Sequence, residues 1–317
     1  MAQTIEGQKV KSRSLLTEEM KEGLRKLLRT EPLFDEPMSS HTTVRVGGPA
    51  DAFVSVYSLD ELRMLLSFLR EHQLPLFVLG CGSNIIVRDG GIRGVVVRLN
   101  GEFTKISFNG TAVRAGAGAL LSHLINAAAD MGLSGLEPAV GVPGTVGGAV
   151  ISNAGTATEY IGERVHSVSV LAEDGTQFEV DREALSFGYR HSNVLDFGKL
   201  VIAAVLELER SSPERARERI ERLVEHRRRT QPITIPSAGC VFKNPPNERA
   251  GRLIDMAGLK GFKLGRAQVS EMHANFIVNL GGATAREVIE LTEFVRRAVY
   301  EKFGVLLEYE VQIVGEE

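Results

Sequence analysis

Glycine is concentrated in one part of this chain, and that concentration limits how the segment can fold. The chain has 317 residues, 33 of them glycine, and residues 80–155 hold 16 of the 33. Glycine weakens the interior of a helix or strand but allows tight turns and close backbone approach. Two clusters are prominent, LGCGSN at 79–84 and GVPGTVGGAV at 141–150. The second surrounds a proline with glycines, so we predict that it forms neither a helix nor a strand interior.

Such glycine clusters are suited to phosphate groups, because consecutive backbone N–H groups can point at an anion with no Cβ in the way. The first cluster follows an apolar stretch, but Ile85 stands where the G-x-G-x-x-G dinucleotide pattern needs its third glycine. No Gly-Lys-Ser/Thr sequence is present for a P-loop. We therefore interpret residues 80–84 and 141–155 as two clamps on one dinucleotide pyrophosphate, held between two subdomains. A connector between domains is the alternative interpretation of 141–150.

Composition excludes several other classes of protein. The net charge is −3 and aromatic residues make up 6% with no tryptophan, so we expect no nucleic-acid partner. No apolar run reaches the ~18 residues that a membrane span needs. The cysteines, Cys81 and Cys240, are far apart, and the histidines follow no metal-ligand spacing, so we expect no disulfide framework and no metal site. A cytoplasmic protein is expected.

Hydrophobic periodicity and capping signals predict alternating helices and strands with domain boundaries near residues 100 and 212. Ser58 with Glu61, and Thr284 with Glu287, have the spacing of helix capping boxes. Ser212 and Pro213 are a suitable cap and first residue for a charged helix. The predicted helices are 17–29, 59–72, 119–131, 213–230, 249–257 and 285–303, and the main predicted strands are 51–57, 74–80, 94–99, NFIVN at 275–279 and 305–315.

Six motifs in order along the chain resemble those of one enzyme family. They are HTTVRVGGPAD (41–51), LGCGSN (79–84), GVPGTVGGAVISNAG (141–155), FGYRHS (187–192), PSAGCVFKNP (236–245) and LEYEVQIVG (307–315). Together they resemble UDP-N-acetylenolpyruvoylglucosamine reductase, also called UDP-N-acetylmuramate dehydrogenase, an enzyme of peptidoglycan precursor synthesis. The spacing after Arg190 is short and leaves little room for the extra loop of one subclass. The chain is therefore more similar to the subclass with the shorter loop.

The resemblance implies an α+β protein with an FAD-binding fold of the vanillyl-alcohol-oxidase type. Two subdomains would hold the flavin, and a third, α/β domain would bind the substrate. On this basis residues 1–100, joined by the C-terminal strand 305–317, are predicted as the first FAD-binding subdomain. Residues 101–212 are predicted as the second, and 213–304 as the substrate-binding domain.

The resemblance also implies the reaction and its partners. NADPH is the expected co-substrate, FAD the cofactor, and UDP-N-acetylglucosamine-enolpyruvate the substrate. Hydride addition to the vinyl group drives negative charge onto the substrate carboxylate, and the adjacent carbon is then protonated. The site therefore needs a cation and a positioned acid besides the flavin. A monomer is expected.

Three residues are expected to carry this chemistry. Arg190 matches the family's cation for the substrate carboxylate, and its planar fork suits a carboxylate. Glu310 matches the catalytic glutamate, which could bind the enediolate if protonated or orient Arg190 if ionised. Cys240 stands where the family usually has the serine that donates the proton, and a thiol is the stronger acid. Glu308, two residues before Glu310, is a weaker candidate for the glutamate.

The remaining expected contacts are with the cofactor and with the rest of the substrate. Tyr189 is expected beside Arg190, and Arg227 is a candidate phosphate contact within a charged helix. Asn244 and His273 fall where the family holds the sugar and diphosphate. The expected cofactor-binding residues are Arg45, Gly80, Cys81, Gly82, Ser83, Asn84, Gly141, Gly144, Thr145, Gly147, Gly148, Asn153, Ala154 and Gly155.

Two other functions are compatible with parts of the sequence. Another flavoenzyme of the same fold, acting on an alcohol or hydroxy acid, would share the two glycine clamps but not the PSAGC–FKNP and YEV segments. A non-catalytic dinucleotide-binding regulator would share the glycine turns alone. In addition, TATEYIGE at 156–163 departs from the family pattern, so its role stays open.

Overall fold

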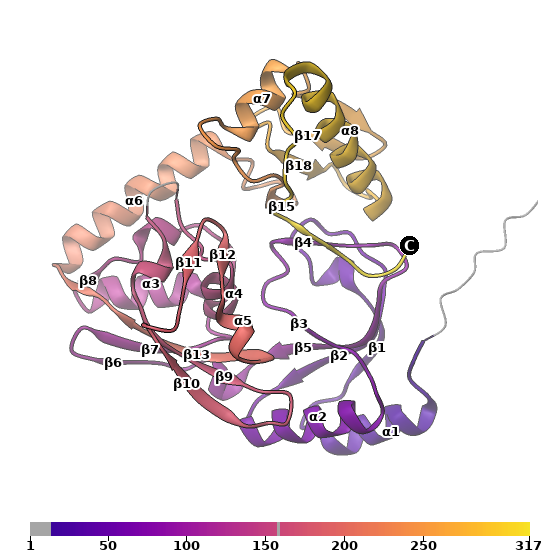
Figure 1. The fold of residues 1–317 in the computed structure, drawn as a ribbon, viewed down its shortest axis with the longest axis vertical. Coiled ribbons are helices and arrows are strands. Elements are labelled where there is room, and N and C mark those ends of the chain that lie inside the picture. Colours follow the sequence, from indigo (N-terminus) through magenta and orange to yellow (C-terminus); the bar gives the residue numbers. More distant parts are fainter. Residues whose placement is uncertain (1–13, 157–158) are drawn as a thin grey trace, which may run out of the picture.

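The structure, a computed structural model, describes residues 14–156 and 159–317. Within these residues the chain forms three blocks, each built on its own principal sheet (Figure 1). The sheets draw their strands from residues 33–99, 106–207 and 237–279. The predicted boundaries near 100 and 212 stay predictions, and the first 13 residues of the predicted first subdomain lie outside the described part.

The first sheet has the strand order β1-β2-β5-β3, with β2, β5 and β3 parallel and β1 antiparallel to β2. Leu62 and Leu65 are fully buried in the core that α2 shares with this sheet. The elements of this block are α1 (Glu18–Leu27), β1 (Leu33–Pro37), η1 (Met38–Ser40), β2 (Pro49–Val56), α2 (Leu59–Glu71), β3 (Leu76–Val78), β4 (Ile85–Val87), β5 (Ile92–Leu99) and η2 (Gly101–Thr104).

Helix α2 begins at the predicted cap, but the capping box is half formed. The Ser58 hydroxyl accepts a hydrogen bond from the Glu61 N–H at 3.2 Å. The Glu61 carboxylate instead accepts the N–H groups of Tyr57 at 2.6 Å and Arg29 at 2.7 Å. It therefore ties the segment after α1 to the start of α2, which explains why this glutamate is buried.

The second sheet is antiparallel throughout, with the order β10-β9-β13-β7-β6. Val113, Val168 and Ala204 face the core, where α4 packs on β7 and β13. The elements are β6 (Ile106–Asn109), β7 (Ala112–Gly116), α3 (Leu121–Asp130), β8 (Leu133–Ser134), η3 (Glu137–Ala139), α4 (Val146–Ile151), η4 (Ile161–Glu163), β9 (Val165–Leu171), β10 (Gln177–Asp181), β11 (Phe187–Gly188), β12 (His191–Ser192), α5 (Val194–Phe197), β13 (Leu200–Glu207) and β14 (Glu209–Arg210).

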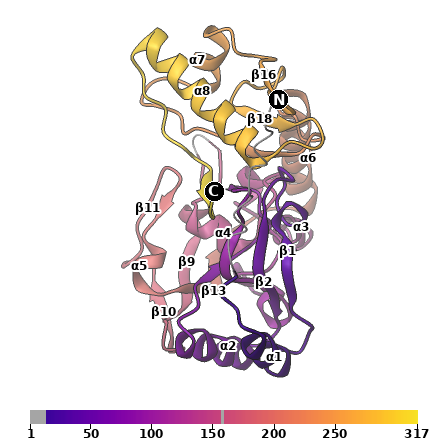
Figure 2. The same cartoon turned by 90° about the vertical axis from the view of Figure 1, so that its right-hand side faces the viewer.

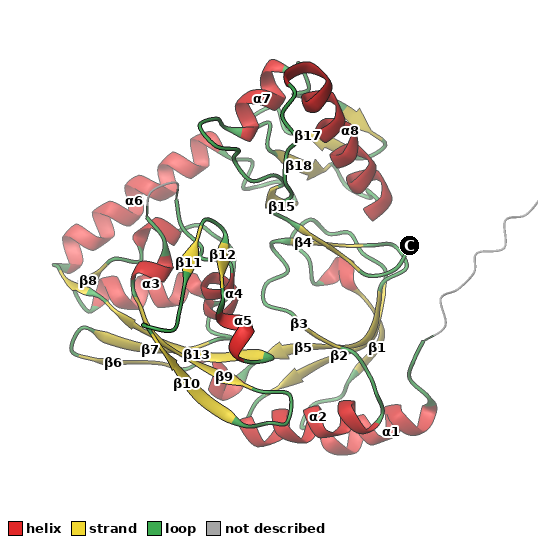
Figure 3. Cartoon of the chain, viewed as in Figure 1, coloured by secondary structure: helices red, strands yellow, loops and turns green. Residues whose placement is uncertain are grey.

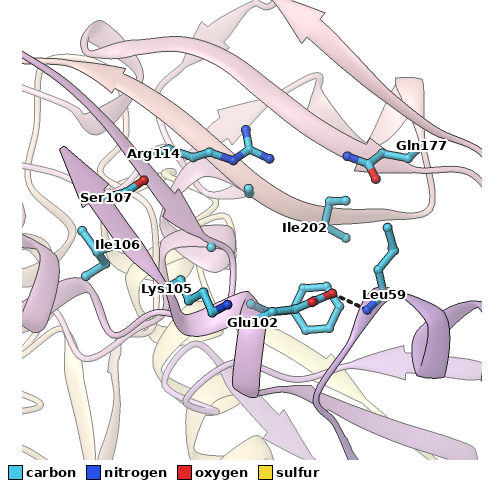
Figure 4. Close-up of a pocket in the computed structure, with 11 residues that line it drawn as sticks. Leu59, Glu102, Lys105, Ile106, Ser107, Arg114, Gln177 and Ile202 are labelled. Carbon is cyan, nitrogen blue, oxygen red and sulfur yellow. Dashed lines mark hydrogen bonds between the residues drawn. The ribbon is translucent and has the colours of Figure 1, made fainter. Parts of the chain in front are cut away.

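The other face of this sheet is polar and borders a hollow of about 490 Å³ (Figure 4). Arg114 on this face donates to the Ser169 hydroxyl at 2.9 Å and lies 3.3 Å from the Glu179 carboxylate. Lys105 and Gln177 also border the hollow, together with the apolar side chains of Ile106 and Ile202. None of the residues predicted for the active site lines it.

The third block has the strand order β15-β18-β17-β16, packed against α8. As predicted, Thr284 and Glu287 form a complete capping box at the start of α8, and Gly304 ends that helix with a φ of +70°. The elements are α6 (Pro213–Thr230), β15 (Ser237–Cys240), α7 (Ala250–Met256), β16 (Lys263–Leu264), β17 (Ala267–Val269), β18 (Phe276–Asn279), α8 (Ala285–Phe303) and β19 (Gln312–Val314).

Helix α6 extends from the second block toward the third (Figure 3). In the side view, α7 and α8 lie at one end of the molecule and α1 and α2 at the other (Figure 2). After α8 the chain returns to the first block, where β19 pairs in parallel with β4. The C-terminal strand therefore ties the third block to the first.

Two details of the predicted elements are wrong. Gly147 and Gly148, expected outside any helix, lie in the first turn of α4, which the Thr145 hydroxyl caps. A Cβ on Gly147 would lie 2.8 Å from the Cβ of Ala117, so close packing on β7 requires glycine within this helix. The final strand is also shorter than 305–315, because the backbone at 308–310 pairs with residues 241–243 before β19 begins.

Candidate active site

Three segments that the sequence analysis assigned to the cofactor lie together. The Thr43 N–H donates to the Gly82 carbonyl at 3.0 Å, which joins the 41–45 turn to the first glycine cluster. The Ser83 hydroxyl hydrogen-bonds to the Pro143 carbonyl, which joins that cluster to the second. A Cβ on Gly80 would lie 2.8 Å from the Thr145 hydroxyl oxygen, so these two clusters are in close contact.

The first glycine cluster presents free backbone donors. Within the described residues, none of the five N–H groups of 80–84 has a hydrogen-bond acceptor. Gly82 has a φ of +61°, and a Cβ there would lie 2.1 Å from the His41 carbonyl oxygen. A left-handed glycine turn whose N–H groups have no acceptor within the protein is what a backbone nest offers to an anion. This arrangement fits the pyrophosphate of FAD.

The remaining predicted cofactor residues border the same place. Arg45 is exposed in the 41–45 turn with a φ of +57°. Cys81 lies near Arg98, and burial raises the pKa of its thiol. Asn84 donates through its side chain to the Glu310 carbonyl at 3.1 Å. Gly141 lies against the side chain of Arg227, so the glycine loops reach a predicted catalytic residue, Glu310, on one side and a predicted substrate contact, Arg227, on the other.

In the turn at 153–155, Asn153 supports a hairpin, and the cofactor contact expected of this turn stays a prediction. The Asn153 amide donates to the Gly188 carbonyl at 2.8 Å and accepts the Gly162 N–H at 2.9 Å. The Ala154 N–H is bonded to the Ala149 carbonyl. Asn153 therefore fixes the β11–β12 hairpin, whose turn carries Arg190. Of the family departure at 156–163, residues 157–158 lie outside the described part.

Arg190 and Glu310 form an ion pair at the centre of the site. The Nε atom of Arg190 lies 2.6 Å from Oε1 of Glu310, and the two side chains are 21% and 14% exposed. Arg190 also reaches the Gly155 carbonyl at 3.4 Å and holds a φ of +55°. Burial raises the pKa of the Glu310 carboxyl although Arg190 lowers it. Glu308 instead lies near Lys243 and is 77% exposed.

Cys240 ends β15 beside this ion pair. Burial, reinforced by the Glu310 carboxylate, raises the pKa of the thiol to about 12, although Arg190 and Arg227 lower it. The thiol is therefore fully protonated at neutral pH. Asn275, which the sequence analysis did not single out, lies close enough to lower the pKa of the Cys240 thiol.

Asn275 also holds the backbone that follows Cys240. Its side chain accepts the Phe242 N–H at 3.0 Å and donates to the Phe242 carbonyl at 2.8 Å. Its own carbonyl accepts the Val241 N–H. The HANFIVN motif contains this asparagine, but its contacts with residues 240–242 span more than thirty positions, so no local pattern reveals them.

Arg227 extends from the last turns of α6 toward the same centre. Its positive charge lowers the pKa of the Cys240 thiol. Burial lowers the pKa of Arg227 itself, and the nearby charge of Arg190 lowers it further. Within the described residues its side chain hydrogen-bonds only to Gln231, at 3.4 Å, and has no carboxylate partner. A buried cation without a counter-ion is costly unless an anion arrives, so this part of the site is suited to an anionic ligand.

Tyr189 separates the ion pair from a hollow of about 640 Å³. The guanidinium of Arg190 lies over its ring at 5.4 Å, and its hydroxyl accepts the Asn244 N–H at 3.2 Å. Asn244 lines the hollow, and its side chain accepts the Ala250 N–H at the start of α7. His273 packs behind, near Gly251, and burial lowers its pKa.

The geometry thus combines a nest for a pyrophosphate, a buried cation–carboxylate pair and a protonated thiol, which is the arrangement of a flavin-dependent oxidoreductase. Family models agree: residues 50–181 match an FAD-binding domain, and 231–314 match the C-terminal domain of UDP-N-acetylenolpyruvoylglucosamine reductase. The chain belongs to the UDP-N-acetylenolpyruvoylglucosamine reductase family.

Individual relatives show how far this likeness extends. The reductase of Moorella thermoacetica is 46% identical, covering 91% of this chain and 95% of the relative. Reductase 2 of Symbiobacterium thermophilum is 45% identical, and the match covers 88% of this chain and 91% of the relative. The crystal structure of the Thermus caldophilus reductase is 40% identical with a TM-score of 0.78, covering 91% of this chain and all of that one. The expected α+β fold with an FAD-binding domain is confirmed.

Two features of the described residues concern a membrane and a metal ion as possible partners. Among the described residues, no helix is long and apolar enough to cross a membrane. Within the same residues, no group of three or more histidine, cysteine or acidic side chains is placed to hold a metal ion.

Proposed function

We propose that this chain reduces the enolpyruvyl group of UDP-N-acetylglucosamine-enolpyruvate with NADPH, forming UDP-N-acetylmuramate for peptidoglycan precursor synthesis. Family membership supports this proposal. The observation that carries it is the Arg190–Glu310 ion pair beside the Cys240 thiol. This reduction needs one cation, one group that positions the cation, and one acid.

The glycine segments would hold the cofactor. The free N–H groups of 80–84 and the adjoining loop at 141–145 would bind the FAD pyrophosphate. When bound, FAD supplies the hydride exchange between NADPH and the substrate. The overall reaction consumes NADPH and one proton and adds two hydrogens across the carbon–carbon double bond.

Arg190 would bind the carboxylate of the enolpyruvyl group. Its Nε donates to Glu310, while the hydrogen bond that its terminal nitrogens make within the described residues, to the Gly155 carbonyl, is long at 3.4 Å. They are therefore available for a carboxylate whose charge grows as the double bond is reduced. Glu310 keeps the guanidinium plane fixed, and the left-handed backbone of residue 190 places that plane at the tip of the hairpin.

Cys240 would protonate the carbon next to the carboxylate. Its raised pKa keeps the proton in place until the enediolate forms, and an enediolate carbon is a much stronger base than a thiolate. The thiolate left behind lies within the influence of Arg190 and Arg227 and then takes a proton from solvent. We propose that Arg227, Tyr189, Asn244 and His273 contact other parts of the substrate, as the sequence predicted.

A coupled assay tests this function. The purified yellow protein is expected to oxidise NADPH only when UDP-N-acetylglucosamine-enolpyruvate is present, with UDP-N-acetylmuramate identified by mass spectrometry. Little oxygen should be consumed. Oxidation of an alcohol or hydroxy acid with oxygen consumption, and none of the enolpyruvyl substrate, would instead identify an oxidase. A cytoplasmic location and a monomeric state stay predictions.

A further inference from the structure

The segment that carries Glu310 is fastened to α8 by contacts that the proposed mechanism does not use. The Tyr309 hydroxyl donates to Oε1 of Glu293 on α8 at 2.6 Å, a length typical of a hydrogen bond to an ionised carboxylate. Three residues further along the helix, Nε of Arg296 donates to the Leu307 carbonyl at 3.0 Å. Two side chains of α8 therefore hold the chain at positions 307 and 309, immediately before the glutamate.

The ring of Tyr309 is held as well as its hydroxyl. The Arg296 guanidinium lies over the ring, 5.4 Å from its centre. The ring of Phe242, which is fully buried, stacks on that of Tyr309 with centroids 5.5 Å apart, and the backbones of these two residues form an antiparallel bridge. Burial and the hydrogen bond to Glu293 raise the pKa of the Tyr309 hydroxyl, so it stays a hydrogen-bond donor at neutral pH.

Tyr309 and Glu310 are neighbours in sequence but contact different parts of the molecule. Tyr309 reaches α8, whereas the Glu310 carboxylate lies 2.6 Å from Nε of Arg190 in the hairpin. The Glu310 N–H donates to the Val241 carbonyl at 2.8 Å, and its own carbonyl accepts the Asn84 amide at 3.1 Å. Because one peptide unit joins the two residues, a displacement of Tyr309 also displaces the carboxylate beside Arg190.

Helix α8 is itself fixed to the first block. Asp89, in the loop after β4, accepts the N–H groups of Ala285 and Arg286 at the start of the helix, each at 2.9 Å. A carboxylate at a helix N-terminus satisfies otherwise unpaired N–H groups and complements the helix dipole. The helix that holds residues 307 and 309 is therefore attached to the same block with which β19 pairs.

We propose that Tyr309 is a positioning residue, which α8 holds in place so that the neighbouring Glu310 carboxylate stays against Arg190. The proposal rests on the proposed function, in which Glu310 orients the guanidinium that binds the substrate carboxylate. Reaction rates depend on such geometry at about the ångström scale, so groups that only support a catalytic side chain still affect the rate. Tyr309 acts through Glu310 and does not bind the substrate.

Anaerobic stopped-flow measurement of the two half-reactions tests this role. In Tyr309→Phe, which keeps the ring but loses the hydroxyl, and in Glu293→Ala, reoxidation of the flavin by UDP-N-acetylglucosamine-enolpyruvate should slow by about tenfold. Reduction of the flavin by NADPH should stay at the wild-type rate, because it does not involve the substrate carboxylate. Glu293→Gln keeps an oxygen that accepts the Tyr309 hydroxyl, so it should recover most of the reoxidation rate.

Two exposed residues of α8 provide matched controls. Tyr300→Phe removes a hydroxyl and Glu290→Ala removes a carboxylate, from side chains that make no hydrogen bond to residues 305–311 within the described part of the chain. Neither variant should change the rate of either half-reaction by more than about twofold, as is usual for surface substitutions.

A double-mutant cycle separates positioning from a general structural role. Glu310→Ala leaves no carboxylate to position, so adding Tyr309→Phe to it should not slow reoxidation further. An additive loss in the double variant would overturn the inference. So would equal slowing of both half-reactions, or an unchanged reoxidation rate in both Tyr309→Phe and Glu293→Ala.

Failure of the proposed function is detected separately. If the wild-type protein reduces no enolpyruvyl substrate, that function has failed, and amide hydrogen exchange of residues 305–311 in the holoenzyme then decides whether Tyr309 anchors the segment. Faster exchange in Tyr309→Phe than in Tyr300→Phe would support the anchor, and equal exchange in the two variants would overturn it.

Discussion

The Nε atom of Arg190 donates a hydrogen bond to Oε1 of Glu310 at 2.6 Å, although 120 residues separate the two in sequence. Arg190 belongs to a hairpin of the second block, and Glu310 to the segment that leads from α8 into β19. The ion pair therefore forms only when the C-terminal segment returns to β4. The geometry of this pair therefore depends on how the C-terminal segment packs against the hairpin of the second block.

Substitution of either partner should lower kcat more than it changes KM. Arg190→Lys keeps the charge but loses the planar fork, and Glu310→Gln keeps an acceptor but loses the charge that orients Arg190. For each, a loss of about 10²–10³ in kcat is expected, comparable to the loss of one transition-state donor. Steady-state kinetics with the UDP-sugar checks this. Glu308→Gln is the control, because that side chain is exposed; a similar loss there would contradict the assignment of Glu310.

Gly82→Ala should impair FAD binding. At φ +61° a new Cβ would lie 2.1 Å from the His41 carbonyl, so the turn that presents the free N–H groups must move. We expect the Kd for FAD to rise at least about tenfold, measured by fluorescence titration. Gly110→Ala is the control, since φ is +63° there and nothing lies within 4 Å of the new Cβ. That variant should lose roughly 1 kcal/mol of stability and keep its FAD affinity; equal FAD affinity in both variants would argue against the nest.

Asn275→Ala should affect stability and catalysis together. It removes both hydrogen bonds to the backbone of Phe242, two residues after Cys240. Leaving the buried Phe242 groups unpaired costs about 1–3 kcal/mol, which urea unfolding will show. If Asn275 positions the thiol, flavin reduction by NADPH stays normal while reduction of the enolpyruvyl substrate slows. Equal slowing of both half-reactions would show a structural role alone.

The Cys240 thiol should make stability fall at alkaline pH. Its folded-state pKa of about 12 lies above the ordinary value of roughly 8.5 for an unfolded thiol. Between these values the folded state holds a proton that the unfolded state has lost, so the free energy of unfolding falls as pH rises, by up to about 1.4 kcal/mol per pH unit. Urea unfolding of the holoenzyme from pH 8 to 10 should show this fall relative to Cys240→Ser. The same pH dependence in both proteins would contradict the buried thiol.

Local signals in the sequence predicted many of the elements and the motif residues, because caps and turns depend on neighbouring residues. Ser212 and Thr284 begin their helices as expected. The motifs also named Arg190, Cys240 and Glu310, which the structure brings together. Their catalytic roles stay predictions.

Contacts between distant segments could not be predicted in this way. Gly147 lies in a helix that packs against Ala117, thirty positions earlier, where a Cβ at 147 would lie only 2.8 Å from that of Ala117. The Glu61 carboxylate does not close the expected capping box. It instead accepts the backbone N–H of Arg29, which belongs to the preceding segment. Asn275 lies in the HANFIVN motif, but its hydrogen bonds to Phe242 are visible only where the ends of β15 and β18 meet.

The central claim is that Cys240 donates the proton in reduction of the enolpyruvyl group, and anaerobic stopped-flow measurement of Cys240→Ala tests it most directly. Reduction of bound flavin by NADPH should proceed at the wild-type rate. Reoxidation of that flavin by UDP-N-acetylglucosamine-enolpyruvate should slow by about 10²–10⁴, the usual contribution of a general acid, and Cys240→Ser should restore a measurable part of it. Reoxidation of the alanine variant at the wild-type rate would contradict the claim.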